Sequence, residues 1–167
     1  MFSCQTVSFS RVSYRVGMAN RFLLDSMIHD KLVDEPRALQ LAADLAANGS
    51  LVLLSTHIQR DEIAKTPDKE RATLLSSVPV EFVPTYGIVA GISRVGMARL
   101  SESEPFETLR GGNLDHTEDA LIAATAHYED ATLVTEDQTL ASRARKQDVP
   151  VLSWGEFYSL MLESERS

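Results

Sequence analysis

The sequence contains a single cysteine, Cys4, and no long apolar run. One cysteine excludes an intramolecular disulfide, and a reducing cytoplasm is the compartment we expect. No stretch reaches the roughly 20 apolar residues of a membrane-spanning helix, so no membrane association is expected. Residues 1–17 also lack the long apolar segment of a secretory signal. We expect them to be an N-terminal extension, disordered or upstream of the true start, before a single domain over residues 18–167.

Basic residues are in short supply, with 16 Lys and Arg against 24 Asp and Glu, and a net charge of −8. A protein that binds nucleic acid through a broad basic surface needs clustered Lys and Arg, so the composition argues against that mode of binding. A nuclease stays open, because acids gathered around divalent cations would present metal rather than carboxylate to the phosphates.

Short apolar segments alternate with amphipathic ones, which predicts parallel βαβ units and an α/β fold with a central parallel sheet. Hydrophobic residues make up 44% of the 167 residues, enough to bury one core. Strands are predicted over residues 21–25, 51–55, 80–84, 131–135 and 149–154. Helices are predicted over residues 37–49, 56–65, 114–128, 136–147 and 155–164.

Three predicted strands end on the spacing of a capping box, which marks a strand that turns directly into a helix. In an open parallel sheet such turns gather along the carboxyl edge of the strands, where ligands bind. We therefore expect the functional site at that edge. The three pairs are Thr56 with Gln59, Thr135 with Gln138, and Ser153 with Glu156.

Acidic residues from four separate segments can converge on this edge. They are Asp25, Glu62, Asp119 and Asp137. Two carboxylates about 4 Å apart repel by about 4 kcal/mol at an effective dielectric near 20, so such a group favours a bound cation. Because all the ligands are oxygens, Mg²⁺ or Mn²⁺ is the expected ion.

Each acid also has a structural explanation when taken alone. Asp119 and Asp137 fall in first helical turns, where the helix dipole favours any carboxylate. Asp61 competes with Glu62 as the acid that points inward, and the spacing from Ile58 favours Glu62. For Asp25, at the end of an apolar strand, we expect no capping role. The predicted site therefore depends on the convergence of the group.

Several segments together resemble PIN-domain nucleases, with the nearest likeness to VapC-type toxins of type II toxin–antitoxin systems. The matching segments are FLLDS (22–26), Asp61-Glu62-Ile63, EDALIAATA (118–126) and LVTEDQTL (133–140). The resemblance implies a three-layer α/β/α sandwich and Mg²⁺- or Mn²⁺-dependent endoribonuclease activity. It further implies an RNA substrate, a small antitoxin partner, a homodimer, metal binding by the acids named above, and a catalytic hydroxyl from Thr135.

The sequence departs from the PIN pattern in several places. Met27 stands where a small polar residue is common, and Leu140 stands where an aromatic residue is usual. Glu136 adds an acid beside Asp137, and no motif accounts for the Tyr86–Asn113 segment. These departures weaken the toxin assignment more than the nuclease assignment.

Three alternatives differ from a toxin nuclease. A phosphatase with Asp25 as nucleophile would need a second aspartate two residues later, where Met27 stands. A non-toxin PIN nuclease in RNA processing fits the same residues. A catalytically inactive PIN module that binds RNA or protein usually follows the loss of one of the acids, and none is lost here.

Overall fold

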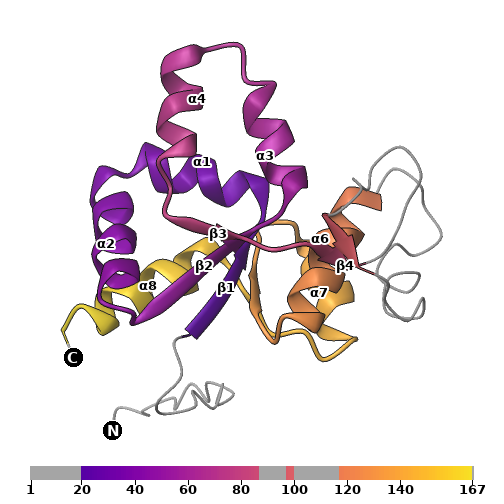
Figure 1. Cartoon of the computed structure of the whole chain (residues 1–167). Helices are drawn as coiled ribbons and strands as arrows, with labels where there is room; N and C mark the ends of the chain where they lie inside the picture. Colours follow the sequence, from indigo (N-terminus) through magenta and orange to yellow (C-terminus); the bar gives the residue numbers. More distant parts are fainter. Residues whose placement is uncertain (1–19, 87–96, 100–116, 167) are drawn as a thin grey trace, which may run out of the picture.

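The computed structural model describes residues 20–86, 97–99 and 117–166 (Figure 1). The predicted extension over residues 1–17 and most of the Tyr86–Asn113 segment lie outside these residues, as do residues 114–116 of a predicted helix. Within the described part of the chain, no helix combines the length and the apolar character needed to cross a membrane.

A five-stranded parallel sheet runs through the middle of the molecule, in the order β3-β2-β1-β6-β7 (Figure 1). Its strands are β1 (Asn20–Leu24), β2 (Leu51–Ser55), β3 (Val80–Phe82), β6 (Thr132–Val134) and β7 (Val151–Leu152). A second, two-stranded parallel sheet pairs β4 (Thr85–Tyr86) with β5 (Ala98–Arg99). All carboxyl ends of the main sheet therefore meet at one edge, as predicted.

Helices cover both faces of this sheet. They are α1 (Ser26–Asp34), α2 (Pro36–Ala47), α3 (His57–Ala64), α4 (Lys69–Ser76), α6 (Thr117–Tyr128), α7 (Gln138–Arg145) and α8 (Trp154–Ser164). On β1, Leu23 packs into a core with α6 and α7, while Phe22 and Leu24 pack into a core with α1, α2 and α8. The alternation follows from the two-residue period of a strand. The predicted three-layer α/β/α sandwich is confirmed.

The predicted strands and helices are present in the described residues, with ends shifted by a few positions. The helices α1 and α4 were missed. Gly49 is the last residue of the helix predicted over residues 37–49, and it lies just after α2 with a φ of 76°. Glycine adopts this conformation without a Cβ penalty.

Two of the three predicted capping boxes are confirmed, at Thr56 and Ser153. The third is wrong, because α7 begins after Asp137, whose side chain caps it. The first N–H groups of α7 are bound by Asp137, while the Thr135 hydroxyl accepts from the Asp137 N–H and donates to the carboxylate of Asp25, the residue after β1.

Candidate active site

Asp25 lies at the centre of the carboxyl edge, directly after β1, the middle strand of the sheet. Its backbone N–H donates to the Val134 carbonyl at 3.1 Å, which continues the ladder between β1 and β6. Its side chain is only 7% exposed. The chain thus holds a carboxylate below the surface at the point where a parallel sheet presents its ligand site.

Both oxygens of the Asp25 carboxylate accept hydrogen bonds. Oδ1 accepts from the backbone N–H of Ser26 at 2.6 Å, and Oδ2 accepts from the hydroxyl of Thr135 at 2.8 Å. The first of these bonds makes Asp25 the N-cap of α1. The expectation that Asp25 has no capping role is therefore wrong, because the missed helix α1 starts at the next residue.

Burial raises the pKa of Asp25 above its ordinary value, and the nearby charge of Asp137 raises it further. The hydrogen bonds from Thr135 and Ser26 act in the opposite direction, because they stabilise the ionised form. A raised pKa means that the ionised carboxylate is poorly compensated by the protein alone. A positive ion at this position would lower that cost.

Thr135 connects Asp25 to Asp137. The Thr135 hydroxyl donates to Asp25 and accepts from the backbone N–H of Asp137 at 3.1 Å. Oδ1 of Asp137 accepts from the N–H groups of Thr139 and Leu140 at 2.7 and 2.9 Å. Asp137 was considered as an acid in a first helical turn, and it is instead the N-cap of α7, while its charge still acts on Asp25.

Glu62 reaches the same edge from α3. The hydroxyl of Ser26 donates to Oε2 of Glu62, so the carboxylate lies against the residue that follows Asp25. Glu62 is half-buried, as is its neighbour Asp61. The contact with Ser26 turns Glu62 toward the first turn of α1.

Gln59 holds α3 in position and was not predicted to do so. Its side chain is fully buried, and Nε2 donates to the Leu24 carbonyl at 2.8 Å. Oε1 accepts from the backbone N–H of Thr56 at 2.8 Å, as the capping box requires. The contact between Gln59 and Thr56 could be predicted from the capping-box spacing. The bond to β1 was not, because nothing in the sequence indicates which strand lies beside α3.

Asp119 lies in the first turn of α6 and is half-buried. The hydrogen bonds described above join Asp25, Ser26, Glu62, Thr135 and Asp137. Over residues 20–86, 97–99 and 117–166, no three His, Cys, Asp or Glu side chains are close enough together to hold a metal ion. The described structure thus brings part of the predicted quartet to one edge without forming a complete ligand set.

Glu136, the additional acid of the last motif, has a structural partner. Its Oε1 accepts from the backbone N–H of Trp154 at 2.7 Å, at the first turn of α8. The dipole of a helix favours a carboxylate at this position. Glu136 therefore links the end of β6 to α8.

The chemistry of the site suits a hard divalent cation, because every candidate ligand offers carboxylate oxygen. Asp25 in particular is a buried acid whose charge lacks full compensation. In their present positions, however, Glu62 is engaged with Ser26 and one oxygen of Asp137 caps α7. An ion held by these residues would take some of its ligands through water, or would draw the side chains together.

Comparison with solved structures identifies the architecture. One chain in the crystal structure of VapBC2 from Rickettsia felis bound to a DNA fragment from their promoter is similar to this chain, with a TM-score of 0.52. The match covers 80% of this chain and 98% of that chain, at 17% sequence identity. The chain has a PIN-like fold. At this identity the likeness to the VapBC2 chain concerns the fold of the PIN-like domain alone.

No protein-family model matches the sequence, and no curated protein sequence matches it. Short motifs around the strand ends carry the resemblance to PIN domains, and the comparison confirms the fold that this resemblance implies. In this chain the fold places the ends of β1 and β6 side by side.

Proposed function

We propose that this PIN-like chain is a Mg²⁺- or Mn²⁺-dependent endoribonuclease that acts in the cytoplasm as the toxin of a toxin–antitoxin pair. One observation carries the proposal. Asp25, buried at the carboxyl edge of the sheet, has a raised pKa and shares a hydrogen-bonded group with Thr135, Asp137 and Glu62. An acid whose pKa is raised by burial at a ligand-binding edge is a candidate for a functional site.

In this proposal Asp25, Glu62, Asp119 and Asp137 hold the metal directly or through water. A bound divalent ion would lower the pKa of a water molecule and stabilise negative charge on the phosphate. Thr135 orients the Asp25 carboxylate and favours its ionised form through its 2.8 Å hydrogen bond. Ser26 positions Glu62 by the same kind of contact.

The mechanism needs no nucleophilic side chain. Asp25 and Thr135 are both buried, so Asp25 would hold a bound ion at a site that is partly shielded from bulk water. Asp119 would join from α6, which packs against β1 and β6 on the same face of the sheet as α7.

We further propose that a small antitoxin protein inhibits the chain, and that two copies of the chain form a homodimer. One solved structure of similar fold is a VapBC2 complex, which supports the first of these partners. The excess of acidic residues, with a net charge of −8, favours an inhibitor segment that carries basic side chains. Rescue of expression toxicity by a neighbouring open reading frame would distinguish a toxin from a housekeeping nuclease.

The experiment is a cleavage assay on structured RNA and on single-stranded DNA, with Mg²⁺, with Mn²⁺ and with EDTA. We expect RNA cleavage by the wild type that Asp25→Asn and Asp119→Asn both abolish. Asp44→Asn is the matched control, because Asp44 is an exposed acid on α2 whose loss changes net charge equally. Cleavage that survives both site substitutions, or that ignores EDTA, would overturn the proposal.

A second candidate is a PIN-like module that binds RNA or protein without cutting. It is favoured by the capping roles of Asp25 and Asp137, which give two of the acids a purely structural use. The same assay decides between the two candidates, provided that RNA binding is measured alongside cleavage. Binding without metal-dependent cleavage would support the module.

A further inference from the structure

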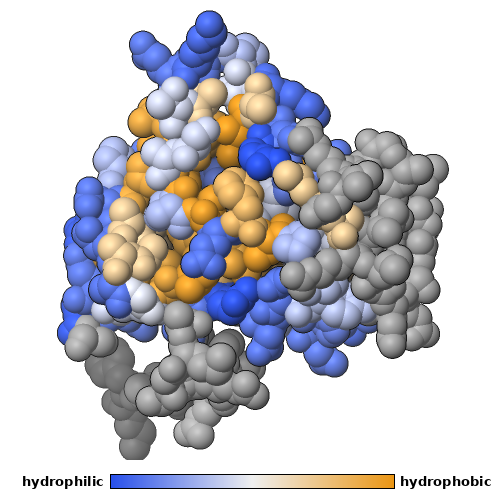
Figure 2. Space-filling view, in the orientation of Figure 1, coloured by the Kyte–Doolittle hydropathy of each residue, from blue (hydrophilic) through white to orange (hydrophobic). Residues whose placement is uncertain are grey.

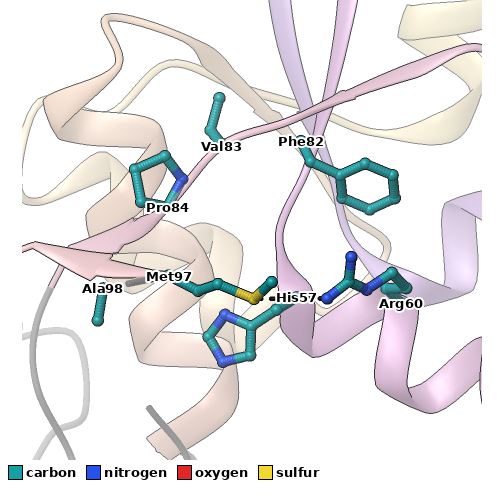
Figure 3. A pocket seen from close by; sticks show the side chains of 7 residues that line it. All are labelled: His57, Arg60, Phe82, Val83, Pro84, Met97 and Ala98. Atoms are coloured by element: carbon teal, nitrogen blue, oxygen red, sulfur yellow. Dashed lines mark hydrogen bonds between the residues drawn. The ribbon is translucent and has the colours of Figure 1, made fainter. Parts of the chain in front are cut away.

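A cleft of about 410 Å³ opens beside the candidate active site, between α3 and the segment that joins β3 to β4 (Figure 3). Its volume falls within the range of about 300–1,000 Å³ that is usual for ligand pockets. In Figure 3, Phe82, Val83 and Pro84 follow one wall of the cleft, while His57 and Arg60 come from α3. Met97 and Ala98 complete the lining.

The cleft lies on the same edge of the sheet as Asp25. Phe82 is the last residue of β3 and pairs in register with Ser55, the last residue of β2. The N–H of Val83 donates to the Ser55 carbonyl at 2.9 Å. Because β1 is the next strand after β2, the backbone of Phe82 is separated from that of β1 by two strand spacings, about 10 Å. Neighbouring nucleotides of one strand can span this distance.

Phe82 and Arg60 give the cleft an aromatic surface and a positive charge. The Phe82 side chain is 56% exposed, although it sits on a strand. The guanidinium carbon of Arg60 lies 5.3 Å from the centre of the Phe82 ring, and Nη2 of Arg60 contacts the sulfur of Met97 at 3.4 Å. Among the residues that the structure describes, no carboxylate forms a salt bridge with Arg60.

The exposed Phe82 ring offers an apolar surface to a ligand, and Figure 2 shows apolar side chains gathered over β2 and β3. The Arg60 guanidinium stacks on the Phe82 ring and lines the cleft. An aromatic ring next to a cation is the combination that binds a nucleotide, since the base stacks and the phosphate pairs with the charge.

We propose that this cleft binds one nucleotide of a single-stranded RNA, with its base against Phe82 and its phosphate near Arg60. The inference rests on the proposed function, because the cleft would supply the base and cation contacts to RNA that the carboxylates of the acidic edge do not offer. Met97 adapts the floor of the cleft to different bases, since a thioether side chain is flexible and polarisable. The subsite therefore discriminates weakly between base sequences and strongly between single-stranded and double-stranded RNA.

The test measures binding of a short, labelled single-stranded RNA of mixed sequence by fluorescence anisotropy, in Mg²⁺, with the full chain carrying Asp25→Asn to prevent cleavage. Phe82→Ala and Phe82→Leu should each raise the Kd for RNA by about 5- to 100-fold, while Phe82→Tyr should leave the Kd unchanged. Leu74→Ala is the matched control, because Leu74 is 50% exposed and does not line the cleft. Since Phe82 is largely exposed, its variants should fold normally.

Arg60→Ala tests the phosphate contact separately. It should weaken binding uniformly across RNA sequences and reduce the slope of log Kd against log salt concentration by roughly one. Arg37→Ala removes an equal charge from the exposed surface of α2 and should leave the slope unchanged. In the cleavage-competent chain, Phe82→Ala should raise KM more than it lowers kcat.

The outcomes separate this inference from the proposed function. Unchanged RNA affinity in both Phe82→Ala and Arg60→Ala would overturn the nucleotide subsite, even if Asp25-dependent cleavage is present, and would leave a peptide as the occupant of the cleft. Affinity lost only in the cleft variants, without metal-dependent cleavage in the wild type, would support the subsite and overturn the nuclease.

Discussion

Thr135→Val removes one hydroxyl from the candidate site and keeps the shape of the side chain. The hydroxyl donates to buried Asp25 at 2.8 Å and accepts from the Asp137 N–H at 3.1 Å. A hydrogen bond to a charged group contributes about 1.5–3 kcal/mol, and a neutral one about 0.5–1.5 kcal/mol. We therefore expect a loss of about 2–4 kcal/mol in the free energy of unfolding, or roughly 5–15 °C in Tm for a chain of this size.

The loss should depend on pH, because only the ionised Asp25 carboxylate needs the Thr135 donor. The Thr135 bond lowers the pKa of Asp25, so the Val variant raises that pKa further. The difference between wild type and variant is then greatest above the folded pKa of Asp25 and shrinks as the pH falls through it. Urea denaturation followed by circular dichroism in EDTA, at neutral and at acidic pH, measures both values.

Thr85→Val provides the matched control. Thr85 is equally buried, but its hydroxyl donates to a neutral acceptor, the Met97 carbonyl, at 3.2 Å. That carbonyl keeps a second donor in the Thr85 N–H at 2.9 Å. The control should cost about 1 kcal/mol at every pH. An equal, pH-independent loss in both variants would refute the reasoning that Thr135 stabilises a charged carboxylate.

Three further predictions concern the edge of the sheet and the end of α2. Asp25→Asn should unfold at a higher temperature than the wild type in metal-free buffer, with a gain that disappears as the pH falls through the raised pKa of Asp25. Mg²⁺ should raise the Tm of the wild type alone. Gln59→Leu should cost about 2–4 kcal/mol in urea denaturation, since the Leu24 carbonyl and the Thr56 N–H lose a buried partner; an unchanged midpoint would contradict this. Gly49→Ala should cost about 1 kcal/mol from backbone strain alone, because φ is +76° and a Cβ there meets nothing within 4 Å.

Most of the sheet was predictable because each strand is a short apolar run bounded by polar capping residues. Phe22 and Leu53 exemplify such runs, and both are buried in one core. Helix α1 was missed because its start depends on Asp25, which looked like a strand residue with no local partner. Helix α4 was missed because its apolar pattern is weak and only Leu75 is buried among its residues.

The candidate site was predictable in part. The strand ends indicated that Asp25, Thr135 and Asp137 lie on one edge, and their hydrogen bonds join them there. The sequence did not indicate that Asp137 rather than Thr135 caps α7, since both residues fit a capping position. It also could not reveal the cleft lined by Arg60 and Phe82, which come from separate elements.

The sequence by itself determined most of the strands and helices, the parallel sheet and the edge where the acids gather, because the two-residue and 3.6-residue periods and the capping residues are local properties. Only the tertiary structure decided which groups meet. The Thr135 hydroxyl turns toward Asp25, Gln59 donates to β1 and Phe82 stays exposed beside Arg60. Each of these contacts joins residues far apart in the chain, and its geometry is fixed by how the layers pack rather than by any neighbouring residue.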